Sequence, residues 1–191
     1  MRNRRILALA TIAVLAMRSV SLAADAAEPT ACGIVTEADA EKFVGGPLDV
    51  KEQAKVPTSN GPGTYNSVCT YIAKGGDVAN AFAAPRAVDL TLNFLHTSEA
   101  MAMIYENSLA GYREAAQADS RFTNVTITPI QGFGDKAFVF EAVTDPKTGY
   151  KSALIVFYKG KIGGSIAAWK KPESATETTK TVLKYVLSKL P

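Results

Sequence analysis

Apolar and polar residues alternate in several short stretches of the chain, with the period of two that is typical of β-strands. In the stretch AVDLTLNFL (87–95), Val88, Leu90 and Leu92 share one side, and the residues between them are polar. Five other stretches have a strand pattern: 67–76, 123–130, 136–143, 151–159 and 161–169. Short links join the later ones, so we predict a mostly antiparallel sheet of about five or six strands.

A period of three to four residues predicts the helices. In residues 97–118, apolar side chains follow this spacing, and the C-terminal stretch 171–190 does the same. A shorter helix is expected after Thr36, which can cap its start, and it would end at Gly45 and Gly46. The expected order is α-β-β-α-β-β-β-β-α, which indicates a single α+β domain over residues 32–190.

The N-terminus has the pattern of an export signal. Three arginines precede an apolar run from Ile6 to Met17, and small residues follow it. We expect a cleavable signal peptide over residues 1–24, with a cut as late as residue 27. The run is too short to span a membrane, which takes roughly 20 apolar residues. The mature protein is therefore expected to be periplasmic or secreted, and soluble without a membrane span.

Export also changes the charge of the protein. The whole chain has 21 basic and 18 acidic residues and a pI of about 8.8. The four arginines before Ala24 leave with the signal, so 17 basic residues face 18 acidic ones in the mature chain. No basic excess remains to attract nucleic acid, and we expect no nucleic-acid partner.

The two cysteines, Cys32 and Cys69, have four possible roles: a lipid anchor, a metal ligand, a redox thiol or a disulfide. Pro29 and the distance from the apolar run argue against a lipid anchor at Cys32. Two cysteines and one histidine are too few for a structural zinc site, and their spacing differs from C-x-x-C. An even cysteine count in an exported chain favours a disulfide between them.

Candidate catalytic residues are sparse. His96 is the sole histidine, and although Ser98 and Glu99 follow it, this spacing at a helix start rarely forms one site. The stretch GFGDKA (132–137) lacks the second half of a dinucleotide-binding motif and precedes a strand, so we interpret it as a turn in which Asp135 binds backbone amides. We expect no enzymatic activity, no metal and no cofactor.

An apolar groove is the main candidate binding site. Phe138 and Phe140 would share one face of a strand, with Ala137 and Val139 on the other, so both faces of the sheet need covering there. Core packing alone could explain the aromatic residues. The alternative is a ligand groove between the sheet and the helix 97–118, formed by these residues: Met101, Tyr105, Phe138, Phe140 and Trp169.

Three motifs carry a resemblance: C-G-I-V-T-E-A-D-A (32–40), C-T-Y (69–71) and GFGDKAF (132–138). Together they resemble a broad set of uncharacterised exported bacterial proteins, whose mature domain begins with a similar cysteine-containing helix. Some of those are lipoproteins, from which this chain departs before Cys32. The resemblance implies a small α+β domain outside the cytoplasm and brings no catalytic residues with it.

These observations predict a non-catalytic extracytoplasmic binding or accessory domain. Its partner would be an unknown envelope protein or a small apolar ligand. The alternative is a lipid or apolar small-molecule binding protein that uses the groove, and a hydrolase is a remote third. Neither the partner nor the oligomeric state follows from the sequence.

Overall fold

The structure is a computed structural model that describes residues 29–75, 87–118, 123–145, 150–170 and 175–191. The expected signal peptide, residues 1–24, lies outside these described residues.

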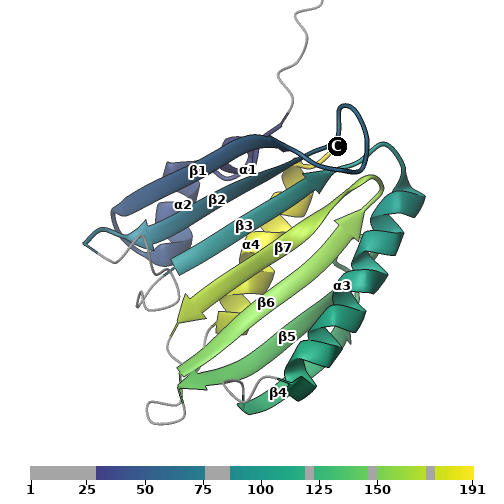
Figure 1. The fold of residues 1–191 in the computed structure, drawn as a ribbon. Coiled ribbons are helices and arrows are strands. Elements are labelled where there is room, and N and C mark those ends of the chain that lie inside the picture. The colour runs from purple at the N-terminus through teal and green to yellow at the C-terminus, as the bar shows by residue number, and fades with distance from the viewer. Residues whose placement is uncertain (1–28, 76–86, 119–122, 146–149, 171–174) are drawn as a thin grey trace, which may run out of the picture.

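Seven strands form one antiparallel sheet, in the order β1-β2-β3-β7-β6-β5-β4 (Figure 1). The strands are β1 (Leu48–Pro57), β2 (Tyr65–Ala73), β3 (Ala87–Phe94), β4 (Thr123–Ile130), β5 (Lys136–Asp145), β6 (Tyr150–Lys159) and β7 (Ile162–Lys170). Two meanders, β1 to β3 and β4 to β7, meet where β3 pairs with β7. A side chain at Gly164 would place its Cβ 1.9 Å from the Thr91 carbonyl oxygen, so this junction requires glycine.

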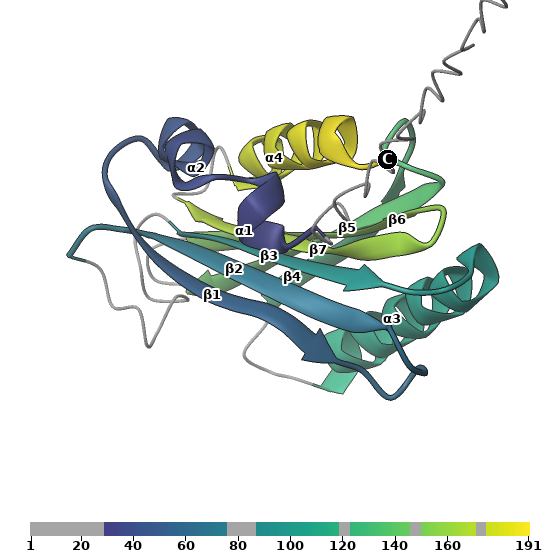
Figure 2. The ribbon, with the colours of Figure 1, turned by 90° about the horizontal axis from the view of Figure 1, so that it is seen from above.

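Helices lie on both faces of the sheet, as Figure 2 shows. Their bounds are α1 (Ala31–Ile34), α2 (Glu37–Val44), α3 (Ser98–Ala118) and α4 (Ala175–Lys189). The helices α1, α2 and α4 share one face, which we call the closed face. The helix α3 lies on the opposite face (Figure 2). The expected single α+β domain with a mostly antiparallel sheet is therefore confirmed.

The predicted strand count was too low, because β1 was not anticipated. The predicted element order also lacked the short helix α1. The Gly, Pro, Ser and Asn content of residues 55–67 is typical of a flexible link, but 55–57 end β1 and 65–67 begin β2. In β1, every residue after Asp49 is exposed, so no apolar alternation marks it in the sequence. Its backbone pairing with β2 makes it a strand.

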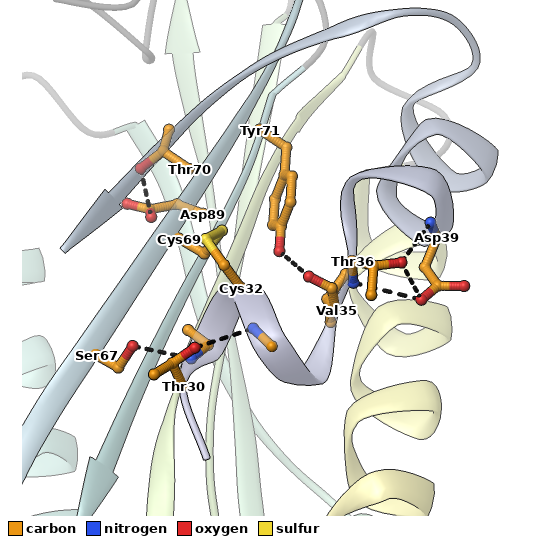
Figure 3. The surroundings of a disulfide bond; sticks show 12 residues. Thr30, Cys32, Val35, Thr36, Asp39, Ser67, Cys69, Thr70, Tyr71 and Asp89 are labelled. Atoms are coloured by element: carbon orange, nitrogen blue, oxygen red, sulfur yellow. Dashed lines mark hydrogen bonds between the residues drawn. A yellow bond between two sulfur atoms is a disulfide. The ribbon is translucent and has the colours of Figure 1, made fainter. Parts of the chain in front are cut away.

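The segment before α2 is tied to β2 by four side chains on the closed face, three of which, Ser67, Cys69 and Tyr71, are labelled in Figure 3. Cys69 forms the predicted disulfide with Cys32, which is thereby confirmed. Tyr65 donates a hydrogen bond to the Pro29 carbonyl at 3.0 Å, and Tyr71 donates one to the Val35 carbonyl. The fourth side chain, Ser67, accepts a bond from the Ala31 amide at 2.8 Å. Successive inward positions of one strand thus hold residues 29–35.

The helix α2 begins with a capping box. The Thr36 hydroxyl accepts a bond from the Asp39 amide, and the Asp39 carboxylate accepts one from the Thr36 amide. Gly45 ends the helix in the left-handed conformation, with φ of 84°. Both ends were expected from the sequence, because a threonine cap and a following glycine satisfy backbone groups that the helix leaves unpaired.

Two apolar clusters fill the space on either side of the sheet. The larger cluster lies under α1, α2 and α4 and includes Leu90, Ile155 and Leu183, none of which is exposed to solvent. The smaller lies under α3 and contains Phe138 and Phe140, whereas Val139 of the same strand belongs to the larger cluster. The expectation that both faces of this strand are covered is confirmed.

Candidate binding surface

The helix α3 covers only part of its face of the sheet. Its apolar side packs on β4 to β6, and Met101 near its start reaches β7. A Cβ at Gly163 would lie 2.5 Å from the Met101 sulfur, so this glycine allows the helix to approach the strand. On the same side of the sheet, no helix in the described ranges covers β1, β2 and β3. We call this part of the sheet surface, next to α3, the open face (Figures 1 and 2).

Four of the five predicted groove residues come together under α3. Tyr105 contacts the ring of Phe138 edge-on, with the centroids 5.5 Å apart, and Met101 and Phe140 belong to the same cluster. Phe138 is fully buried and Phe140 is 5% exposed, so both lie inside the packing between helix and sheet. Trp169 lies on β7, but its side chain is outside the described part of the structure.

A small cleft borders this packing, between α3 and the strands β3, β6 and β7. Its volume is about 90 Å³. The lining residues are Asn93, Met101, Ile104, Tyr105, Ser108, Tyr112, Val156, Phe157, Gly164 and Ser165. Pockets that bind drug-sized ligands span roughly 300–1,000 Å³, so this cleft has room for a single side chain or a similarly small group.

The lining of the cleft is uncharged and partly polar. Within the described residues, the side chains of Asn93 and Ser165 form no hydrogen bond. Burial raises the pKa of Tyr105 and of Tyr112, so both phenols keep their protons. Across the strand pair from Asn93, the Oδ1 atom of Asn66 is buried without a hydrogen-bond partner. The cleft can therefore offer donors and acceptors to a neutral group.

One carboxylate lies near the middle of the open face. Asp89 pairs with Thr70 on β2 and with Ala167 on β7, and it alternates with the buried Val88 and Leu90. The Thr70 hydroxyl donates a hydrogen bond of 3.0 Å to Asp89 Oδ1 (Figure 3). Burial raises the pKa of Asp89, and the bond from Thr70 offsets part of that rise. This carboxylate is thus held in place on a face that α3 leaves uncovered.

The candidate catalytic residues do not form a hydrogen-bonded set. His96 Nε2 bonds to the Pro62 carbonyl, in the loop between β1 and β2, while Ser98 donates to Glu99 at 3.3 Å. Asp135 accepts a bond of 2.7 Å from the Gly160 amide. The interpretation of GFGDKA as a turn with Asp135 on a backbone amide is therefore confirmed.

In the ranges that the structure covers, no three His, Cys, Asp or Glu side chains gather as metal ligands would. No helix among the described residues combines the length and the hydrophobicity needed to cross a bilayer.

Comparisons with known proteins add no family: no protein-family model matches the chain, and no curated protein matches it either. The surface must be interpreted from its own chemistry.

The sequence indicated this surface but not its key residue. The alternation in 87–95 predicts Asp89, Thr91 and Asn93 on a solvent-facing side of the strand; the structure places all three on the face opposite Val88 and Leu90, where they are half-buried. The alternation did not show that Asp89 would be partly buried, because that depends on strands β2 and β7 on either side. The available signal for Asp89 was that it is the one charged residue among the polar positions of this strand, which continue with Thr91 and Asn93.

Proposed function

We propose that this chain is a non-catalytic extracytoplasmic binding domain that contacts a partner protein through its open face. The observation that carries the proposal is the incomplete cover by α3. Helix α3 packs over β4 to β6 and leaves a mixed face on β2, β3 and β7. Its half-buried residues include Thr70, Thr91 and Ser165, whereas Ile72 on the same face is fully buried. A surface of this kind, edged by a cleft, suits a partner that supplies its own hydrogen-bonding groups.

The extracytoplasmic location is supported by two features of the chain. The first is the basic and apolar N-terminal pattern of residues 1–24. The second is the disulfide between Cys32 and Cys69, since such bonds persist in oxidising compartments and are rare in the cytosol. Both features agree with a periplasmic or secreted location.

The size of the cleft favours a protein over a lipid. A volume of about 90 Å³ is too small for an acyl chain or a drug-sized ligand, and Phe138 and Phe140 are occupied in the packing under α3. A single side chain of a protein partner fits that space, and the flat strands beside it can bury the surroundings. Specific protein interfaces bury roughly 800 Å² on each partner, which the cleft alone would not supply.

Site-specific photocrosslinking in the native envelope tests this role. A photoreactive amino acid at Thr91, on the open face, should give a defined adduct with an envelope protein. The same amino acid at Thr181, exposed on α4, is the matched control and should not give it. Equal adduct patterns from both positions would contradict the proposal.

Binding of an apolar small molecule is the second candidate function. It is favoured by the apolar side of the cleft, where Met101, Ile104 and Val156 lie together. Fluorescence of Trp169, the sole tryptophan, can be followed during titration with fatty acids and hydrophobic dyes. A saturable response at micromolar ligand would favour this candidate over protein binding, and a flat response would remove it.

A further inference from the structure

The carboxylate of Asp89 lacks a cationic partner among the described residues. Its one side-chain hydrogen bond there comes from the neutral hydroxyl of Thr70. Lys51 lies in the same cross-strand row, beyond Thr70, and is exposed, but no ion pair joins it to Asp89. Asp89 is half-buried, and partial burial without a cationic partner is unfavourable because the charge loses hydration.

Strands β2 and β7 flank Asp89. On the β7 side, the residue directly opposite is Ala167, and Ser165 and Trp169 occupy the two diagonal positions. On the β2 side, Thr70 binds Oδ1 and leaves Oδ2 without a described partner. Asp89 is only partly buried, so a basic side chain can reach this carboxylate from the solvent side of the sheet.

A second contact point lies further along the same strand. Asn93 follows Asp89 by four residues on β3, which corresponds to about 13 Å in an extended strand. Asn93 lines the cleft, whose described walls carry no charged side chain. The open face thus has one negative point and one neutral, partly apolar point at a fixed separation.

We propose that the open face recognises a protein segment that places a lysine or arginine side chain on Asp89 and an uncharged side chain in the cleft at Asn93. This inference rests on the proposed binding function and specifies the chemistry of the partner. The basic group supplies the charge that Asp89 lacks, and charge-assisted hydrogen bonds are roughly twice as strong as neutral ones. The uncharged side chain fits a cleft that would penalise a buried charge.

The first experiment uses methylguanidinium as a probe for the basic group. The isotope-labelled mature protein is titrated with methylguanidinium chloride against sodium chloride at equal ionic strength, and the carboxyl ¹³C shift of Asp89 is followed by NMR. We expect a saturable shift at Asp89 and at the Thr70 amide. In the Asp89→Asn variant the Thr70 response should vanish, whereas in Asp49→Asn, a change on β1, which β2 separates from β3, it should persist.

A shift at Asp89 no larger than that of Asp49 would overturn the proposal. So would saturation by spermidine at micromolar concentration, because a free polyamine would then be the occupant in place of a protein segment.

The second experiment separates this inference from the proposed function. Crosslinking from position 91 is repeated in Asp89→Asn, Asp49→Asn and Ser165→Gln, the last of which fills the cleft. We expect about tenfold less adduct with Asp89→Asn and Ser165→Gln and no change with Asp49→Asn. Loss with Ser165→Gln alone would overturn the role of Asp89 and keep the binding function. Melting curves confirm that each variant is folded, and Asn93→Ser replaces Ser165→Gln if that variant is not.

Discussion

The closed and open faces of the sheet are formed by the same strands, yet their side chains differ in kind. On the closed face, β3 presents Val88, Leu90 and Leu92, all nearly or fully buried under helices. On the open face, the same strand presents Asp89, Thr91 and the cleft residue Asn93. Apolar burial on the closed face stabilises the fold, whereas the half-buried polar residues of the open face should contribute little to folding.

The clearest way to test this division is to break the disulfide on the closed face. The double variant Cys32→Ser/Cys69→Ser should lose about 4 kcal/mol of unfolding free energy, because the unfolded chain regains the freedom of a long loop. Urea denaturation of the mature protein measures the change. A reducing agent should destabilise the wild type and leave the variant unaffected; equal midpoints for both proteins without reductant would contradict the expectation.

Substitutions on the two faces compare how much side-chain packing on each contributes to stability. Leu183 of α4 is fully buried on the closed face, and Leu183→Ala should cost about 3 kcal/mol through lost burial and a residual cavity. The matched change on the open face, Thr91→Ala, should stay within about 0.5 kcal/mol of the wild type. Chemical denaturation of both variants gives the comparison, and similar losses would show that the open face also stabilises the fold.

Helix caps allow a finer comparison. Thr36→Ala removes the capping box of α2 on the closed face, which should cost about 1 kcal/mol. Thr97→Ala removes one bond, to the Ala100 amide at 3.2 Å, at the start of α3, so its effect should be smaller. Thermal unfolding of the two variants at one pH measures the difference; a larger loss for Thr97→Ala would reverse the ranking.

The smallest expected effect is at Asp89 and depends on pH. Burial raises its pKa in the folded state above the unfolded value of about 3.9, so the folded state favours the protonated form. Stability is therefore lowered as pH rises through the folded pKa. The neutral Asp89→Asn variant can still accept the Thr70 bond and should melt at a higher temperature than the wild type at pH 7.

This advantage should shrink toward pH 3, where Asp89 of the wild type is protonated in both states. A melting difference that does not change with pH would show that the carboxylate is not destabilised by burial.

Sequence patterns predicted the elements whose side chains meet a core. The alternation of β3 and the three-to-four spacing of α3 come directly from burial on one side, and Thr36 and Gly45 mark the ends of α2 through backbone chemistry. Strand β1 was not predicted, because most of its residues are exposed to solvent and it is a strand through its backbone pairing with β2. The groove expected between the sheet and the helix 97–118 shares Met101 and Tyr105 with the cleft. Its small size was not predicted, because it depends on how closely α3 packs on strands distant in sequence, for example at Gly163.

The link between Cys32 and Cys69 also determines how the domain would carry mechanical load. A pull on the N-terminus reaches β2 through the two sulfur atoms, and the 37-residue separation between them is bypassed. While the bond is intact, α2 and β1 bear no tension, and extension must begin by separating β2 from the strands beyond it. Reduction would lengthen the force path by that whole loop and would expose α1 and β1 to the pull first.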